Sequence, residues 1–273
     1  MQAQLASIHC YPLKSGAPMT LAEASVESRG LAGDRRWMVV DAATGKFVTG
    51  RQFARLPLVR AVPGDGGALQ LDAPGMPPLR VEPPDADGER IDTAVWQAAV
   101  SPLLADAAAH EWLSRFLGTA LRLVHMDERC DRRVKQMYEG RFGREEDRVS
   151  LADAFPLLLI SQAALDQLNA KLASPVPMLR FRPNLVVSGT APHAEDEWRC
   201  IRIGGIEFDV VKPCTRCVFT TVDFERGERD PGGEPLRTLT TYRRTPDGVT
   251  FGQNLIPRGT GTLRSGDTVD ILL

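Results

Sequence analysis

The 273-residue sequence predicts an α+β fold that is β-rich, with a barrel-like sheet and a few covering helices. Short apolar runs such as RRWMVVDA and NLVVSG recur along the chain and are typical of strands. Turns rich in Gly, Pro and Asp separate these runs, most densely from Gly64 to Arg90. Apolar residues at helical spacing are confined to two segments, so the helices should be few.

The first helix should begin at Ser101-Pro102 and stop at Gly118, because apolar residues recur at every fourth position between these signals. The second should begin at Ser161, a good N-cap residue, and keep its apolar register to Leu172. After it, five segments have the β-branched composition of strands. These segments are NLVVSG, CIRIGGIEFDVV, CVFTTVDF, LRTLTTYRR and DTVDILL.

Charge and cysteine content exclude several classes of protein. Lys plus Arg is 33 and Asp plus Glu is 35, so no global field would draw the surface to nucleic acid or anionic lipid. The sequence contains no apolar run of membrane-spanning length and no secretory signal at its start, so we expect no membrane partner. An odd number of mostly scattered cysteines argues against a secreted disulfide framework and favours a cytoplasmic protein. The cysteines are Cys10, Cys130, Cys200, Cys214 and Cys217.

The sharpest local feature is the pair Cys214 and Cys217, which precedes a β-branched run. A thioredoxin-type dithiol should instead open a helix, whose N-terminus lowers the thiol pKa. A zinc site needs a second pair of ligands, and the four histidines form no spaced partner motif. A third interpretation is a transition-metal site that needs a single soft thiolate ligand, for which one cysteine suffices. Lys212 and Arg216 would favour the deprotonated form of that cysteine.

Three further segments bring a cation or a compact donor to a place where a loop meets a strand. Such groups suit recognition of phosphate and of a polar heterocycle. Taken singly, each is more often a salt bridge or a turn than a ligand site, and only their conjunction favours binding. The segments are Lys14-Ser15-Gly16, Gly33-Asp34-Arg35-Arg36 and Phe181-Arg182-Pro183-Asn184.

Several segments of the sequence resemble those of a known protein family. FRPNLVVSG, AEDEW, CTRCVFTTVD, EPLRTLTTYR and FGQN, in that order, resemble the MOSC domain of the mitochondrial amidoxime-reducing component and YcbX-like proteins. YPLKSG and GLAGDRRWMVVD resemble the N-terminal β-barrel portion of the same group. The resemblance implies a MOSC_N β-barrel-like domain over 1–120, whose first strands contribute to a cofactor cleft. A MOSC β-barrel with covering helices would follow over 121–273.

The same resemblance implies that the cleft binds a molybdenum cofactor, molybdenum held by molybdopterin, with Cys217 as the metal's thiolate ligand and a catalytic residue. Residues matching the family's phosphate- and pterin-binding positions are Lys14, Ser15, Arg35, Arg182, Asn184, Thr215 and Arg216. Ser161 is either a further cofactor contact or an ordinary N-cap. Asp223 and Gln253 could approach the open face of the metal as proton relay or substrate contact, although a strand-end turn explains Asp223 equally well.

The implied activity is molybdenum-dependent reduction of N-hydroxylated compounds, namely hydroxylamines, N-hydroxylated purines and amidoximes. The sequence has no C-x4-C-x2-C run for a plant-type iron–sulfur cluster, so electrons should come from a separate ferredoxin- or flavin-type reductase. Two alternatives stay open. The protein could carry the molybdenum cofactor without catalysis, or Cys217 could act as a persulfide in sulfur transfer.

Overall fold

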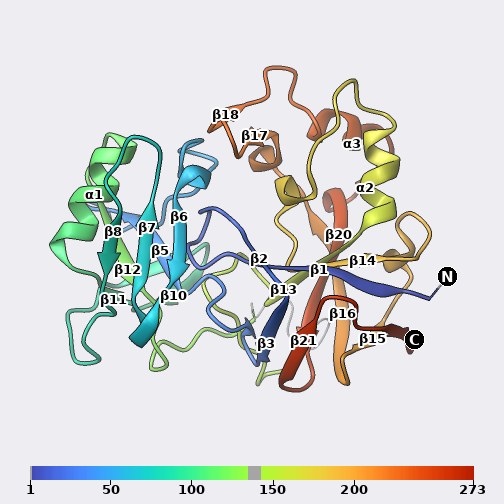
Figure 1. The fold of residues 1–273 in the computed structure, drawn as a ribbon, viewed down its shortest axis with the longest axis horizontal. Helices are drawn as coiled ribbons and strands as arrows, with labels where there is room; N and C mark the ends of the chain where they lie inside the picture. Colours follow the sequence, from blue (N-terminus) through green and yellow to red (C-terminus); the bar gives the residue numbers. More distant parts are fainter. Residues whose placement is uncertain (1, 135–142) are drawn as a thin grey trace.

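The computed structural model describes residues 2–134 and 143–273, and Figure 1 shows two lobes joined by the first part of the chain. One lobe holds helix α1 and several small sheets, and the other holds the largest sheet with helices α2 and α3. Strands dominate the regular structure of the described residues, so the β-rich α+β prediction is confirmed. The three α-helices in this part of the chain span Ala107–Leu117, Gln162–Asn169 and Leu236–Tyr242.

The largest sheet is mixed and contains strands from both ends of the chain. Its order is β2-β1-β14-β13-β20-β16-β15-β22, with β19 added to β20. Strands β13 and β14 are parallel, and the other neighbours are antiparallel. The bounds are β1 Gln4–Cys10, β2 Met19–Leu21, β13 Leu157–Ser161, β14 Leu185–Ser188, β15 Cys200–Ile203, β16 Ile206–Thr215, β19 Arg244–Thr245, β20 Gly248–Pro257 and β22 Val269–Ile271.

This sheet differs from the barrel that the sequence predicted. Its pairing path is open among the described strands, although the two ends approach each other. Gln4 of β1 forms an isolated bridge with Thr268, and Leu5 N donates to Asp267 O at 2.8 Å. Gly266 N and Val269 N also donate to Leu5 O and Ala3 O, but these contacts do not extend into a strand ladder. Among the described strands the largest sheet is therefore mixed and not a closed barrel.

Helix α2 connects the two parallel strands. Parallel neighbours need a crossover connection, and α2 provides part of it between β13 and β14. The hydroxyl of Ser161 accepts a hydrogen bond from Ala164 N at 3.2 Å, so the predicted N-cap is confirmed. The helix ends at Asn169, and Leu172 therefore lies beyond it.

The smaller sheets form the lobe that contains α1. Trp112, Leu113 and Phe116 of α1 are buried in the same core as strands β5, β7 and β12. The sheets are β11-β12-β5, β6-β7-β8 and the hairpin β9-β10. Their strands span Trp37–Asp41 (β5), Arg60–Pro63 (β6), Leu69–Asp72 (β7), Leu79–Val81 (β8), Thr93–Val95 (β9), Ala98–Val100 (β10), Leu103–Leu104 (β11) and Leu121–His125 (β12).

The predicted start of the first helix at Ser101-Pro102 is wrong. Leu103 and Leu104 pair with β12 as strand β11, so the chain is extended at this point. The helix begins four residues after Leu103, where the Asp106 carboxylate accepts a hydrogen bond from Ala109 N at 2.8 Å. Strand pairing over Leu103–Leu104 thus delays the helix to the next capping residue.

Two segments that the sequence predicted as strands are helical. LRTLTTYRR contains α3, and VFTT after Cys217 forms a 3-10 turn, η6, over Val218–Thr221. Threonines bond back to the preceding turn in both, as in Thr240 Oγ1 to Leu236 O at 2.8 Å and Thr221 Oγ1 to Val218 O at 2.8 Å. These bonds satisfy the hydroxyls locally, so β-branched composition was misleading here.

The remaining small sheets link distant parts of the chain. Sheet β21-β3-β4 pairs strand β21, from the C-terminal part of the chain, with a hairpin from the N-terminal part, and β17-β18 is a short hairpin after η6. Their strands span Glu23–Glu27 (β3), Gly30–Leu31 (β4), Val222–Asp223 (β17), Glu228–Arg229 (β18) and Gly261–Arg264 (β21).

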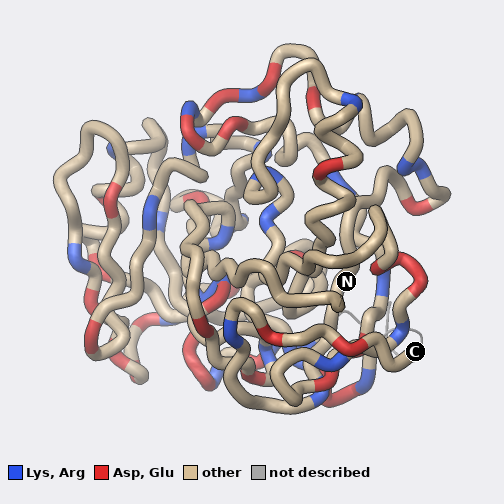
Figure 2. Tube along the Cα trace, turned by 45° about the vertical axis from the view of Figure 1, so that its right-hand side comes forward, with Lys and Arg blue, Asp and Glu red and all other residues tan. Residues whose placement is uncertain are grey.

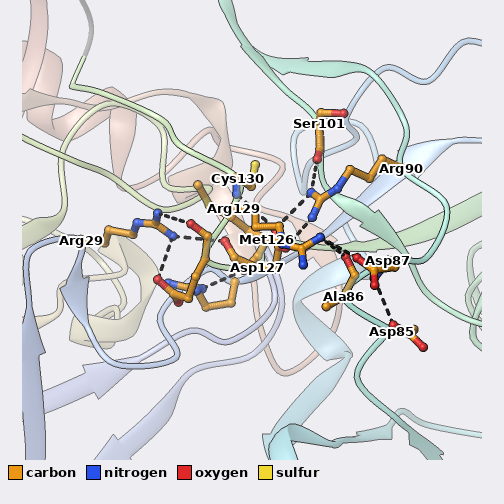
Figure 3. Close-up of polar contacts among 12 residues, drawn as sticks. Arg29, Asp85, Ala86, Asp87, Arg90, Ser101, Met126, Asp127, Arg129 and Cys130 are labelled. Carbon is orange, nitrogen blue, oxygen red and sulfur yellow. Dashed lines mark hydrogen bonds and ion pairs between the residues drawn. The ribbon is translucent and has the colours of Figure 1, made fainter.

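A polar network fastens the segment after β12, as Figure 3 shows. Asp127 pairs with Arg90 at 2.5 Å, and its carbonyl accepts from Arg29 at 3.3 Å. Arg129 pairs with Asp87 at 2.8 Å. Because Arg29 lies between β3 and β4 and Arg90 precedes β9, the network joins three separate stretches of sequence.

Charge is distributed evenly at the level of the whole fold. Figure 2 shows Lys and Arg interspersed with Asp and Glu along the trace, and the net charge of the sequence is −2. Among residues 2–134 and 143–273, no helix has the length and hydrophobicity that a membrane crossing demands.

Candidate functional site

A cavity of about 480 Å³ is lined by residues from both halves of the chain. Loops after β1, β5 and β9 contribute to it from the N-terminal half, and β16 with the turn that follows contributes from the C-terminal half. Eight residues that the sequence singled out lie in its wall. They are Lys14, Ser15, Arg35, Arg182, Asn184, Thr215, Arg216 and Cys217.

Three other candidates are not part of this wall. Ser161 caps α2, and Gln253 donates to Asp196 Oδ1 at 2.7 Å. Asp223 pairs with Arg180, itself a wall residue, at 3.3 Å. The side chains of Ser161 and Gln253 therefore have hydrogen-bond partners outside the cavity wall. Asp223 is linked to the cavity through the guanidinium of Arg180.

Cations dominate the cavity wall although the chain as a whole is slightly acidic. Among the described lining residues, Asp153 is the single carboxylate. The cations are Lys14, Arg35, Arg51, Arg180, Arg182, Lys212 and Arg216. Such a local excess of positive charge favours an anionic ligand.

Two arginines of this wall are held against one tyrosine. The guanidinium carbons of Arg35 and Arg182 lie 4.2 and 4.1 Å from the ring centroid of Tyr11. Arg35 also donates to Asn184 Oδ1 at 2.9 Å, and Arg182 donates to Gly16 O at 2.6 Å. Burial lowers the pKa of Arg182 to about 10. The network fixes both guanidiniums before any ligand arrives.

Not every donor of the wall arginines has a partner within the protein. The Nη2 atom of Arg182 and the Nε atom of Arg216 are buried without a hydrogen-bond partner. A buried donor left unpaired costs about 1–3 kcal/mol. These two atoms are therefore suited to an oxygen-rich ligand that would accept from them.

Backbone strain also concentrates at the cavity. Ser15, Arg35, Trp96 and Arg182 have φ values of 64°, 48°, 59° and 58°, and all four are wall residues. The left-handed region costs a non-glycine residue about 1–2 kcal/mol. Strain of this kind persists where the surrounding structure holds side chains in functional positions.

Lys14 is buried beside Asp153. Its Nζ donates to Leu151 O at 2.7 Å and to Asp153 Oδ1 at 2.5 Å. Burial lowers the pKa of Lys14 to about 8, although the Asp153 carboxylate opposes this shift. The other oxygen of Asp153 accepts from Arg51 Nη2 at 3.2 Å.

Cys217 is positioned by its own turn and by Arg51. Thr220 N and Thr220 Oγ1 donate to Cys217 O at 3.0 and 2.9 Å, which fixes the backbone at the start of η6. Arg51 Nε donates to Cys217 Sγ at 3.1 Å. The neighbouring Cys214 Sγ accepts from Arg216 Nη1 at 2.9 Å. Each sulfur of the C-x-x-C motif thus has its own guanidinium donor.

Sequence reasoning missed Arg51, Trp96 and Asp153, which come from loops without a recognisable motif. One signal was present in the Thr-Gly-Arg turn that contains Arg51. A Cβ at Gly50 would lie 2.0 Å from Phe219 Cε2, so glycine alone allows this turn to approach the Cys217 turn. A glycine at which any side chain would clash marks a place where two segments approach each other closely. The sequence alone does not show which segment approaches.

The donor set bears on the kind of metal that the cavity could hold. Outside residues 1 and 135–142, no three His, Cys, Asp or Glu side chains cluster as metal ligands. A metal here would need to bring most of its ligands with it, as molybdenum bound to a pterin dithiolene would. The sulfur of Cys217, several cations and two unpaired donors fit that group.

Comparisons with known proteins agree with this description. Residues 2–120 match the model of the MOSC N-terminal beta barrel domain, and residues 146–270 match the MOSC domain. Mitochondrial amidoxime-reducing component 1 of Danio rerio is 36% identical over 95% of this chain and 82% of that protein. The Mus musculus and Homo sapiens proteins of the same name are 34% and 32% identical, each over 98% of this chain and 82% of their own length.

These names correct the prediction of a cytoplasmic protein, which is wrong because the relatives are named as mitochondrial. Cysteine content argued against a secreted disulfide protein, but it does not distinguish the cytoplasm from an organelle. Sequence identity above 30% over most of both chains, together with the two domain matches, decides the family. The chain belongs to the MOSC-domain family of the mitochondrial amidoxime-reducing components.

Proposed function

We propose that this protein is an oxidoreductase that uses a molybdenum cofactor to reduce N-hydroxylated compounds. In the overall reaction R–NH–OH takes up two electrons and two protons and gives R–NH2 and water. The observation that carries the proposal is the common cavity of Cys217, seven cations and two unpaired guanidinium donors. The names of the relatives support amidoximes as one substrate class.

The wall residues divide into roles by their chemistry. Cys217 would supply the one protein sulfur to the metal, since thiolate is a soft ligand. Phosphate and pterin oxygens would accept from Lys14, Arg182 and Arg216, because planar and point-charge cations recognise such groups. Four further residues, Ser15, Arg35, Asn184 and Thr215, line the same wall and would complete the binding surface.

When bound, the molybdenum cofactor would supply a two-electron redox centre that takes the oxygen from substrate. The chain itself would bind and orient the cofactor and the substrate, and it would exclude water from the cavity. Lys14 holds a proton at the wall, and its lowered pKa makes Nζ an easier proton donor than an ordinary lysine. Asp223 would affect proton supply only through Arg180, and contacts of Ser161 and Gln253 with the cofactor stay predictions.

Electrons would come from a separate partner protein, of the ferredoxin or flavin type. The described cavity wall contains two cysteines, Cys214 and Cys217, too few for a plant-type iron–sulfur cluster. A partner would therefore deliver electrons at or near the open side of the cavity, and the substrate would be a small molecule.

The test is metal content combined with turnover. The protein is purified from a host that makes the cofactor, and molybdenum per chain is measured for wild type, Cys217→Ala and the control Cys200→Ala. Cys200 lies in β15, outside the cavity wall. We expect near-stoichiometric molybdenum in wild type and in Cys200→Ala, loss in Cys217→Ala, and reduction of an amidoxime with a chemical reductant.

Other results would reject the proposal in distinct ways. Molybdenum without turnover of any N-hydroxylated compound would assign the protein to cofactor storage or delivery. Failure of the wild type to hold molybdenum after cofactor loading would exclude the cofactor itself. A labelled persulfide on Cys217 in metal-free protein would favour sulfur transfer.

A further inference from the structure

The exposed apolar side chains of this protein are unevenly placed. Five large hydrophobic residues are exposed in the part of the chain that the structure describes. Three of them end the chain, namely Ile271, Leu272 and Leu273. The other two are Trp96, 46% exposed in the cavity wall, and Val218, 39% exposed directly after Cys217. Away from the C-terminus, the exposed large apolar side chains of the described residues are thus Trp96, which lies in the cavity wall, and Val218, which follows the wall residue Cys217.

Trp96 is held in place although it is exposed. It lies in the turn of the β9-β10 hairpin with a φ of 59°, directly after the fully buried Val95. The Phe47 ring packs edge-on against the indole, with centroids 5.3 Å apart and planes at 79°. Arg51 lies over the indole, with its guanidinium carbon 4.6 Å from the ring centroid. These contacts fix the indole in one orientation at the mouth of the cavity.

The same arginine connects Trp96 with Cys217. While its guanidinium stacks on the indole, its Nε donates to Cys217 Sγ at 3.1 Å. One guanidinium therefore spans the space between ring and sulfur.

We propose that Trp96 is a specificity-determining residue that stacks on a planar aromatic ring of the substrate while the N–OH group enters the cavity. This inference rests on the proposed function and adds the part of the substrate that is recognised away from the reacting atoms. The cation-rich wall suits the polar N–OH group, and the exposed indole of Trp96 suits the ring. Aliphatic N-hydroxylated compounds lack this second contact and are the poorer substrates.

The kinetic test compares benzamidoxime with acetamidoxime, which carry the same reacting group on an aromatic ring and on a methyl group. We expect Trp96→Ala to lower the ratio of kcat/KM for benzamidoxime over acetamidoxime about tenfold, the size of a lost aromatic stack. Trp96→Phe keeps a ring and should restore most of the ratio. Ile271→Ala removes a side chain of similar exposure, 49%, outside the cavity and serves as control.

A binding measurement separates this inference from the proposed function. Trp96 is the exposed tryptophan, because Trp37, Trp112 and Trp198 are 4–6% exposed. Benzamide, a neutral compound that has no N–OH bond to reduce, should protect the fluorescence of Trp96 from acrylamide quenching, and acetamide should not. The signal is assigned by subtracting that of Trp96→Phe, whose melting temperature shows that the variant is folded.

The outcomes distinguish the two claims. Turnover with an unchanged substrate ratio in Trp96→Ala overturns the role of Trp96 and leaves the reductase standing. Protection by benzamide without turnover of either amidoxime supports ring binding and rejects the reductase. An unchanged ratio with a raised KM for the electron-donor protein overturns substrate stacking and assigns Trp96 to partner docking.

Discussion

Arg51 Nε lies 3.1 Å from Cys217 Sγ, across 166 positions of sequence. The same guanidinium pairs with Asp153 at 3.2 Å and covers the indole of Trp96. Arg51 thus joins the N-terminal lobe to the cysteine that the proposed function makes a metal ligand. A charge-assisted hydrogen bond to the sulfur would orient that ligand.

Replacing Arg51 should weaken cofactor retention. We expect Arg51→Gln to lower molybdenum retention during dialysis about tenfold, the usual effect of losing a partner that orients a metal ligand. Arg51→Lys keeps the charge without the planar fork and should fall between wild type and Arg51→Gln. Arg55→Gln is the matched control, because Arg55 stacks on Phe116 and is not a wall residue. Equal retention in Arg51→Gln and Arg55→Gln would contradict the assignment.

Adding one methyl group at Gly50 should disturb the joint between the lobes. Because its Cβ would lie 2.0 Å from a Phe219 ring atom, we expect Gly50→Ala to lower the free energy of unfolding by about 1–3 kcal/mol. Urea denaturation measures this change. Gly64→Ala is the control, since its Cβ would meet nothing closer than 3.6 Å and its φ is −117°. Truncating the ring in Gly50→Ala/Phe219→Ala should remove the clash, and strictly additive losses would argue against it.

The capping residue of α1 distinguishes the observed start of this helix from the one that the sequence predicted. Asp106→Ala should cost about 1 kcal/mol of stability, because Asp106 accepts from Ala109 N at the helix start. Ser101→Ala should cost less than about 0.5 kcal/mol, since Ser101 makes an exposed bond to Asp92. Thermal unfolding monitored by circular dichroism compares the two variants. A larger loss in Ser101→Ala would favour the earlier start.

Lys14 should make stability depend on pH in the alkaline range. Its pKa is about 8 in the folded protein, against about 10.4 for an ordinary lysine, so the unfolded state binds more protons between these values. Stability from this residue therefore rises with pH from about 8 to about 10, with a slope of at most about 1.4 kcal/mol per pH unit.

The measurement is urea unfolding of cofactor-free protein at several pH values from 7 to about 10.5, a range set by the two pKa values. Lys14→Met should lose the rising component, whereas Lys46→Met, which removes an exposed lysine of the same lobe, should keep it. Parallel pH profiles for wild type and Lys14→Met would show that burial does not perturb Lys14.

The parts of the site that sequence predicted are those with a local signature. PLKSG, GDR, FRPN and CTRC each combine a turn with a donor, and the structure brings all four to one wall. Arg51 and Asp153 have no such signature, because their roles arise from contacts over 166 and 139 positions of sequence. Tertiary packing likewise overrode β-propensity in α3, where the buried Leu239 and the back-bonded threonines favour a helix.

Strand β1 has a consequence for how the molecule is made. It is synthesised long before its neighbour β14, which lies about 180 positions later, at Leu185–Ser188, and pairs with it from Gln4 to Ile8. Strand β2 can pair with one edge of β1 early, but the edge that β14 covers stays unpaired until most of the chain has been made, which exposes it to wrong partners. A fragment cut at residue 120 would separate β1 from β14 and leave both edges open. The two sequence domains are thus expected to mature as one cooperative unit, with nascent-chain protection most needed at β1.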